Sequence, residues 1–112
     1  MREEDVRRFY VSVNEQASRH RGAKKYQEAA ASLALAAEIR PDNPQIFFSL
    51  ARNSALAGAK RQALEALKKA IELGFTNADE IAGNEDFASI RNEAAYKRLI
   101  EDARRKAQSE KR

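Results

Sequence analysis

Apolar and small residues along the chain fall at the spacing of helix faces. Near the N-terminus, for example, the spacing i, i+3, i+4, i+7 and i+11 places apolar residues on one side of a helix, at Val6, Phe9, Tyr10, Val13 and Ala17. Only four glycines and two prolines interrupt the 112 residues, and most of the others are strong helix formers. The pattern therefore predicts an all-α fold.

The same residue types also recur at an interval of 34 residues. The matched positions are Ala17 with Ala51, Ala29 with Ala63, Leu33 with Leu67, Ala36 with Ala70, and Ile39 with Leu73. Each copy is interrupted near its middle, the first around Gly22 and Lys24 and the second around Gly58 and Lys60. We interpret each copy as helix, turn and helix. Alanine at the facing positions would let two antiparallel helices pack closely. Stacking one helix pair on the next would bury apolar surface that a single pair leaves exposed.

The second copy, residues 44–73, resembles the tetratricopeptide-repeat family. Its matching residues are Phe47 for the bulky aromatic, Leu50 and Ala51 for the Leu-Gly pair, Gly58 for the turn glycine, and Ala63, Leu67 and Ala70 for the second-helix signature. The first copy, about residues 10–43, matches best in its second half, through Tyr26, Ala29, Leu33, Ala36 and Pro41. The resemblance implies a right-handed α-α superhelix and a non-catalytic protein-protein interaction module.

We expect one domain over residues 1–112. A helical extension from residue 3 leads into repeat 1 (about 10–43) and repeat 2 (about 44–75), and a helical cap follows at 76–107. The 34-residue register ends near Gly74. In the cap, Asn77 can start one helix, Asn84 or Glu85 a second, and Asn92 the last. Residues 108–112 are expected to fray, because no apolar residue follows Ala107.

In stacked helix pairs the first helix of each pair lines the concave side. We therefore expect a groove that binds a protein or peptide partner, formed by Asn14, Ser18, Arg21, Gln45, Phe48, Ser49, Arg52 and Ala55. Phe48 cannot share one core stripe with Phe47, so it is either a groove anchor or is covered by the long first helix. Arg21 and Arg52 favour an anionic or C-terminal carboxylate ligand. The clamp of the family's chaperone-binding members is incomplete, because Ser49 stands where an asparagine is expected.

We expect no enzymatic activity, no cofactor and no metal. The chain has no cysteine, and its single histidine, His20, falls on the apolar stripe of the first helix. Adjacent carboxylates such as Asp79 and Glu80 point apart on a helix, so they do not converge on one substrate. The glycines fit turns and helix ends, and none forms a phosphate-binding motif.

The charge balance bears on the partner and on the compartment. The 21 basic and 17 acidic residues give a net charge of +4, but no segment is a basic block, so nucleic acid is not the expected partner. No stretch approaches the roughly 20 apolar residues that span a bilayer. The N-terminus lacks the apolar run of a secretory signal. We expect a cytoplasmic protein, unless the domain was excised from a longer secreted chain.

Two alternatives to a peptide-binding adaptor follow from the same features. The adaptor predicts a stable monomer with an accessible Phe48. A self-associating structural or scaffold domain would instead form a homodimer through the ends of the short stack, where apolar surface stays uncovered. The chain could also be an accessory domain of a larger protein.

Overall fold

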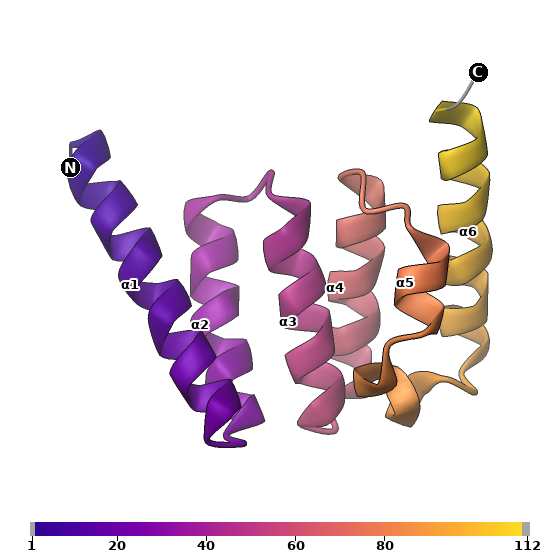
Figure 1. Ribbon diagram of the computed structural model, residues 1–112, viewed down its shortest axis with the longest axis horizontal. Coiled ribbons are helices and arrows are strands. Elements are labelled where there is room, and N and C mark those ends of the chain that lie inside the picture. Colours follow the sequence, from indigo (N-terminus) through magenta and orange to yellow (C-terminus); the bar gives the residue numbers. More distant parts are fainter. Residues whose placement is uncertain (1, 111–112) are drawn as a thin grey trace.

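The computed structural model describes residues 2–110, which form helices and turns without a β-strand (Figure 1). The elements are α1 (Glu3–Gly22), α2 (Tyr26–Ile39), α3 (Pro44–Leu56), α4 (Lys60–Glu72), α5 (Ala78–Ala82), the 3-10 helix η1 (Glu85–Ile90) and α6 (Ala94–Glu110). The predicted all-α class is confirmed. No helix within residues 2–110 is long and apolar enough to cross a membrane.

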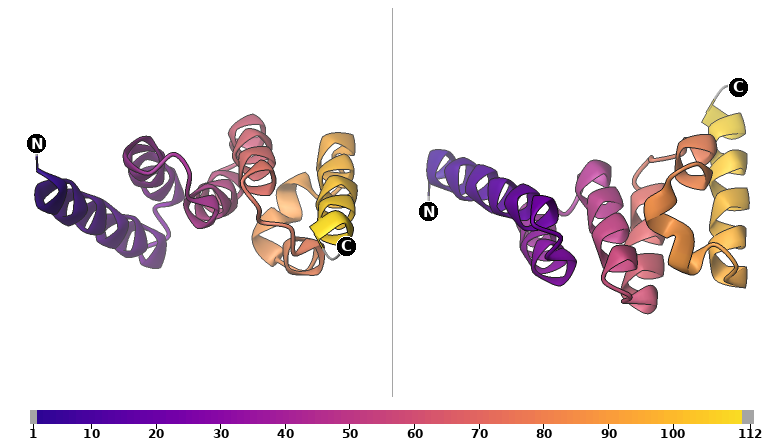
Figure 2. Two further views of the ribbon diagram at one scale, coloured as in Figure 1. Left: turned by 90° about the horizontal axis from the view of Figure 1, so that it is seen from above. Right: turned by 60° about the horizontal axis from the view of Figure 1, so that its bottom comes forward.

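The first four helices form two antiparallel hairpins, α1 with α2 and α3 with α4 (Figure 1). Figure 2 shows that they alternate between two layers, with α1 and α3 in one layer and α2 and α4 in the other. The C-terminal elements α5, η1 and α6 follow α4 at the end of this row, and η1 packs against α3. α1 lies at the opposite end.

Turn chemistry explains where these helices begin and end. Asn43 caps α3 by accepting a hydrogen bond from the Gln45 backbone N–H at 3.0 Å, and Pro44 occupies the first turn. Two residues after the last residue of α1, α3 and α4, the backbone turns through a residue with positive φ, Lys24 (φ 60°), Gly58 (φ 80°) and Gly74 (φ 115°). Lys24 stands 34 residues before Gly58, so the repeat extends to the turn. A side chain in this conformation costs about 1 kcal/mol relative to glycine.

The residues matched by the 34-residue interval occupy equivalent buried positions. Four of the five pairs are buried: Ala17 with Ala51, Ala29 with Ala63, Leu33 with Leu67, and Ala36 with Ala70. The fifth pair, Ile39 and Leu73, is half-buried. The apolar stripe of α1 is less covered than predicted, because Phe9 remains 47% exposed at the edge of the hairpin.

The C-terminal segment begins its helices close to the predicted positions. The side chains of Asn77 and Asn84 accept hydrogen bonds from the backbone N–H groups of Glu80 (3.1 Å) and Asp86 (2.9 Å). α6 begins at Ala94, two residues after Asn92. These asparagines act locally, which is why the pattern alone located them.

At its C-terminal end α6 continues through Glu110, within the segment 108–112 for which fraying is expected. Polar contacts hold the last turns, since Thr76 Oγ1 donates to the Glu110 carboxylate at 3.2 Å and Lys106 Nζ donates to the Glu72 carbonyl at 3.2 Å. A search for apolar anchors could not reveal them. Residues 111 and 112 lie outside the described residues.

Candidate functional site

Part of the predicted groove lies on the surface of α1 and α3. Ser18 and Gln45 are exposed, and Asn14 and Ser49 are half-buried. The Asn14 side-chain amide donates to the Tyr10 carbonyl one turn earlier at 2.9 Å, so its N–H is engaged within its own helix. These four residues could meet a partner without disturbing the core.

Phe48 is not accessible, so that prediction is wrong. The side chain is 3% exposed, and its ring stacks on Phe75 with centroids 4.0 Å apart and meets the edge of Phe87 at 5.8 Å. Ala55 is buried as well, and its carbonyl accepts a hydrogen bond from Ser89 Oγ at 3.0 Å. Residues after α4, rather than the first helix, cover this part of the groove.

Arg21 and Arg52 converge on one carboxylate that belongs to the chain itself. Arg21 Nη2 lies 2.8 Å from Asp86 Oδ2, and Arg52 Nε lies 3.1 Å from the same oxygen. The Arg52 guanidinium also lies over the Phe48 ring, 5.7 Å from its centroid. The cluster joins α1, α3 and η1, and it occupies the place where an anionic ligand was expected.

Asn53 completes this cluster from the buried side. Its Oδ1 accepts a weak hydrogen bond from Arg21 Nη1 at 3.4 Å, while its Nδ2 donates to the Ser49 carbonyl at 2.9 Å. Sequence reasoning missed both Asp86 and Asn53. Two features of the sequence could have indicated Asp86. Arg21 and Arg52 had no carboxylate assigned to them, and the acidic pair Glu85 and Asp86 directly precedes a phenylalanine.

The aromatic packing continues from Phe87 to Tyr96 of α6, with ring centroids 6.0 Å apart. The Tyr96 hydroxyl donates to the Ile81 carbonyl at 3.2 Å. Burial raises the pKa of Tyr96 above its ordinary value of 10.0, and the nearby Arg91 guanidinium offsets part of that effect. Tyr96 is therefore a neutral structural residue of the cap.

What remains open of the predicted groove is a shallow hollow of about 630 Å³ along α1. Asn14 and Ser18 line it together with four residues that the predicted groove omitted, Tyr10, Val11, Glu15 and Arg19, of which Val11 is 47% exposed. No residue of α3 borders this hollow. The predicted groove thus survives as a surface of one helix rather than a cleft between two.

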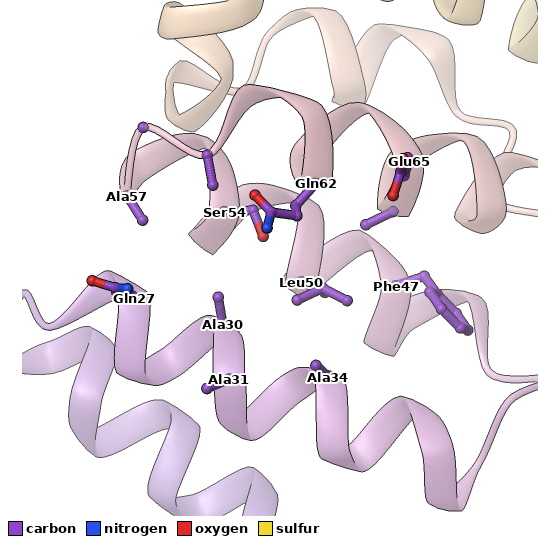
Figure 3. A pocket seen from close by; sticks show the side chains of 13 residues that line it. Gln27, Ala30, Ala31, Ala34, Phe47, Leu50, Ser54, Ala57, Gln62 and Glu65 are labelled. Carbon is purple, nitrogen blue, oxygen red and sulfur yellow. The ribbon is translucent and has the colours of Figure 1, made fainter.

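A larger hollow of about 700 Å³ opens on the other layer, between α2 and α4 (Figure 3). Its floor is α3, through Phe47, Leu50 and Ser54, and most of its wall residues are alanine or glycine. The wall residues are Gln27, Ala30, Ala31 and Ala34 from α2, Ala57, Gly58 and Ala59 from the turn, and Gln62, Glu65 and Ala66 from α4. None of the eight predicted groove residues belongs to this set.

The larger hollow is lined almost entirely by uncharged side chains. Glu65 is the one ionisable residue among those that line it, and its carboxylate pairs with Arg61 at 3.2 Å. A lone carboxylate has no second titratable group with which to share acid and base roles. Within residues 2–110, no group of three His, Asp or Glu side chains is placed to hold a metal ion.

Compared with models of known protein families, with curated proteins and with solved structures, the chain gives no match. The resemblance to tetratricopeptide repeats therefore rests on the residues of the two copies.

Proposed function

We propose that this chain is a short array of tetratricopeptide-type repeats that binds a partner protein and catalyses no reaction. In this proposal the two hairpins belong to a right-handed superhelix, and the C-terminal elements cap it. Two features support the repeat assignment: the equal burial of residues 34 positions apart, and the turn that recurs at Lys24 and Gly58.

The observation that carries the binding function is the apolar hollow between α2 and α4. Exposed apolar surface that is hollowed, open and rimmed by polar side chains is typical of a contact site for another protein. Here Phe47 and Leu50 are the large apolar residues at the floor, and Gln27 and Gln62 stand at the rim. A partner side chain that entered the hollow would contact both large residues.

The hollow fits an amphipathic helix. Its two walls are helices of 14 and 13 residues, each about 20 Å long at 1.5 Å per residue, which is enough for three to four turns of a third helix. Alanines at Ala30, Ala31 and Ala34 place no bulky group in the way, so a helix backbone can approach closely. One or two apolar residues on that helix would reach Phe47 and Leu50.

The experiment compares the two faces of the protein with one matched pair of substitutions. Ala34→Arg places a long cation in the hollow between α2 and α4, and Ser18→Arg places the same side chain on the predicted concave surface. Both positions are exposed, so both variants should fold. A displayed library of amphipathic helices selected on the wild-type protein supplies the ligands.

We expect Ala34→Arg to weaken binding of the selected helices at least about tenfold, the size of effect found at a binding hot spot. Ser18→Arg should bind them as the wild type does. Isothermal titration calorimetry measures both affinities, and circular dichroism checks that helicity is unchanged. Binding that is lost with Ser18→Arg and kept with Ala34→Arg would overturn the assignment and favour the concave surface of α1.

A further inference from the structure

The outer face of α1 is uncovered along its length. Figure 2 shows α1 at the end of the row of helices, with α2 on one side and no described element on the other. A straight stripe of five exposed residues follows this face at intervals of four and three, Asp5, Phe9, Ser12, Gln16 and Arg19. That spacing is the one with which a helix meets a second helix in a coiled coil, but only Phe9 of the five is apolar, so recognition along this stripe depends on its charges.

The charges along this face are reversed about its midpoint. Asp5 lies seven residues before Ser12, and Arg19 lies seven residues after it. Beside the stripe, Arg8 and Glu15 are also seven residues apart and opposite in charge. From the N-terminus the four charges are negative, positive, negative and positive. A second α1 helix that runs in the opposite direction therefore presents a charge of the opposite sign at each of these places.

Within the chain these charges act mainly on their own helix, because Asp5 lies in the first turn of α1 and Arg19 in its last turn, where each favours the helix dipole. In the part that the structure describes, Arg8, Glu15 and Arg19 form no ion pair, and Asp5 meets only Arg2, at 3.9 Å. That pair joins two well-exposed side chains, and such pairs contribute little to stability. The face is thus available to an external partner with the complementary order of charges.

We propose that the partner of this face is a second copy of the chain, with the two α1 helices antiparallel about a two-fold axis at Ser12. Asp5 of each copy then lies opposite Arg19 of the other. Arg8 of each copy lies near Glu15 of the other, because in an antiparallel pair the same flanking positions meet. The small side chain of Ser12 at the axis lets the helices approach, and each Phe9 packs beside Gln16 of the other copy.

The charge pattern selects both this partner and this direction. A parallel pair of α1 helices would place Asp5 on Asp5 and Arg19 on Arg19, which is repulsive. Antiparallel pairing brings opposite charges together, Asp5 with Arg19 and Arg8 with Glu15. Each of these contacts occurs twice, because the two-fold axis of an isologous interface repeats it. The surface is separate from the hollow between α2 and α4. A result that overturns the dimer therefore leaves the proposed partner-binding function untouched, and the reverse also holds.

The test reverses one charge at a time. Asp5→Arg gives a chain with arginine at both ends of the stripe, and Arg19→Asp gives a chain with aspartate at both ends. Each single variant should sediment as a monomer at concentrations where the wild type is a dimer in analytical ultracentrifugation. A mixture of the two should form a heterodimer, because each arginine then faces an aspartate, and the double variant should dimerise again.

Glu28→Arg is the matched control. Glu28 is exposed in the first turn of α2, and reversing it changes the net charge as Asp5→Arg does, but it lies on another helix and outside the stripe. The control should dimerise as the wild type does, and 1 M salt should weaken the wild-type dimer. A wild type that stays monomeric at its highest soluble concentration, or single variants that dimerise unchanged, would overturn the proposal.

Discussion

At the scale of single residues, Asp86 supplies from within the chain the carboxylate that Arg21 and Arg52 were expected to take from a ligand. Both guanidinium groups reach the same oxygen, and the Asp86 side chain is 19% exposed. Hydrogen bonds to a partly buried charge contribute more to stability than those of fully exposed pairs. Asp86 therefore holds η1 against α3, and it occupies the surface around Arg21 and Arg52 that a partner was expected to bind.

Replacing Asp86 with asparagine tests this role. Asp86→Asn removes the charge and leaves two arginines close together, so we expect the free energy of unfolding to fall by about 1 to 2 kcal/mol. Glu65→Gln is the control, because its pair with Arg61 joins two exposed side chains and should change stability by about 0.5 kcal/mol or less. Urea denaturation measures both variants. Equal losses would show that Asp86 is no more than a surface charge.

Residue roles could be predicted from the sequence where they depend on near neighbours. Asn77 and Asn84 were identified as helix caps, because a cap contacts backbone groups only two or three residues away. Phe48 could not be placed, since its neighbours Phe75 and Phe87 lie 27 and 39 residues further along the chain. Its burial depends on how the C-terminal segment docks, and no local pattern encodes that.

At the scale of elements, the two hairpins are copies that differ in detail. Their matched alanines and leucines are buried alike, but the turn of the first hairpin has Lys24 where the second has Gly58. The first hairpin is also half uncovered, because nothing in the described residues packs beyond α1. Equivalent positions can therefore be compared directly within one chain.

Enlarging the matched alanines tests whether the two hairpins pack equally tightly. Ala29→Leu and Ala63→Leu each insert a large side chain at a position with no exposed surface, and each should destabilise the protein by about 1 to 3 kcal/mol. Ala31→Leu, at an exposed position of α2, should cost less than either. Chemical denaturation measures the free energy of unfolding of the three variants. Loose packing of the first hairpin would show as a small effect at Ala29 alone.

The order of the helices could be predicted from the sequence, whereas the position of the cap could not. Within residues 10–73 the same pattern of residues occurs in both copies, so each helix and each turn is indicated twice. After Gly74 no third copy exists, and the apolar residues there fix a helix face without saying which surface it covers. The predicted concave groove was partly wrong for this reason: η1 covers Phe48 and Ala55. The hollow between α2 and α4 was also missed, because Phe47 and Leu50 were assigned wholly to the core.

At the scale of the whole molecule, the buried residues form two clusters of unequal size. Within residues 2–110, the cluster around α1 and α2 contains six buried residues, and the cluster around α3, α4 and the C-terminal elements contains sixteen. Phe47 and Leu50 are partly buried and pack against both. Because hydrophobic stabilisation grows with the apolar area that is buried, most of it lies in the C-terminal two thirds of the chain.

This imbalance means that the protein need not open all at once. The first hairpin can detach as a unit while the larger cluster stays folded, as cooperative units do in repeat arrays. Native-state hydrogen exchange at a concentration where the chain is monomeric would reveal this. The Leu67 amide should exchange at least about tenfold more slowly than that of Leu33, its equivalent 34 residues earlier, which corresponds to about 1.4 kcal/mol. Equal protection would mean that both hairpins unfold together, and the chain would then behave as a single cooperative unit.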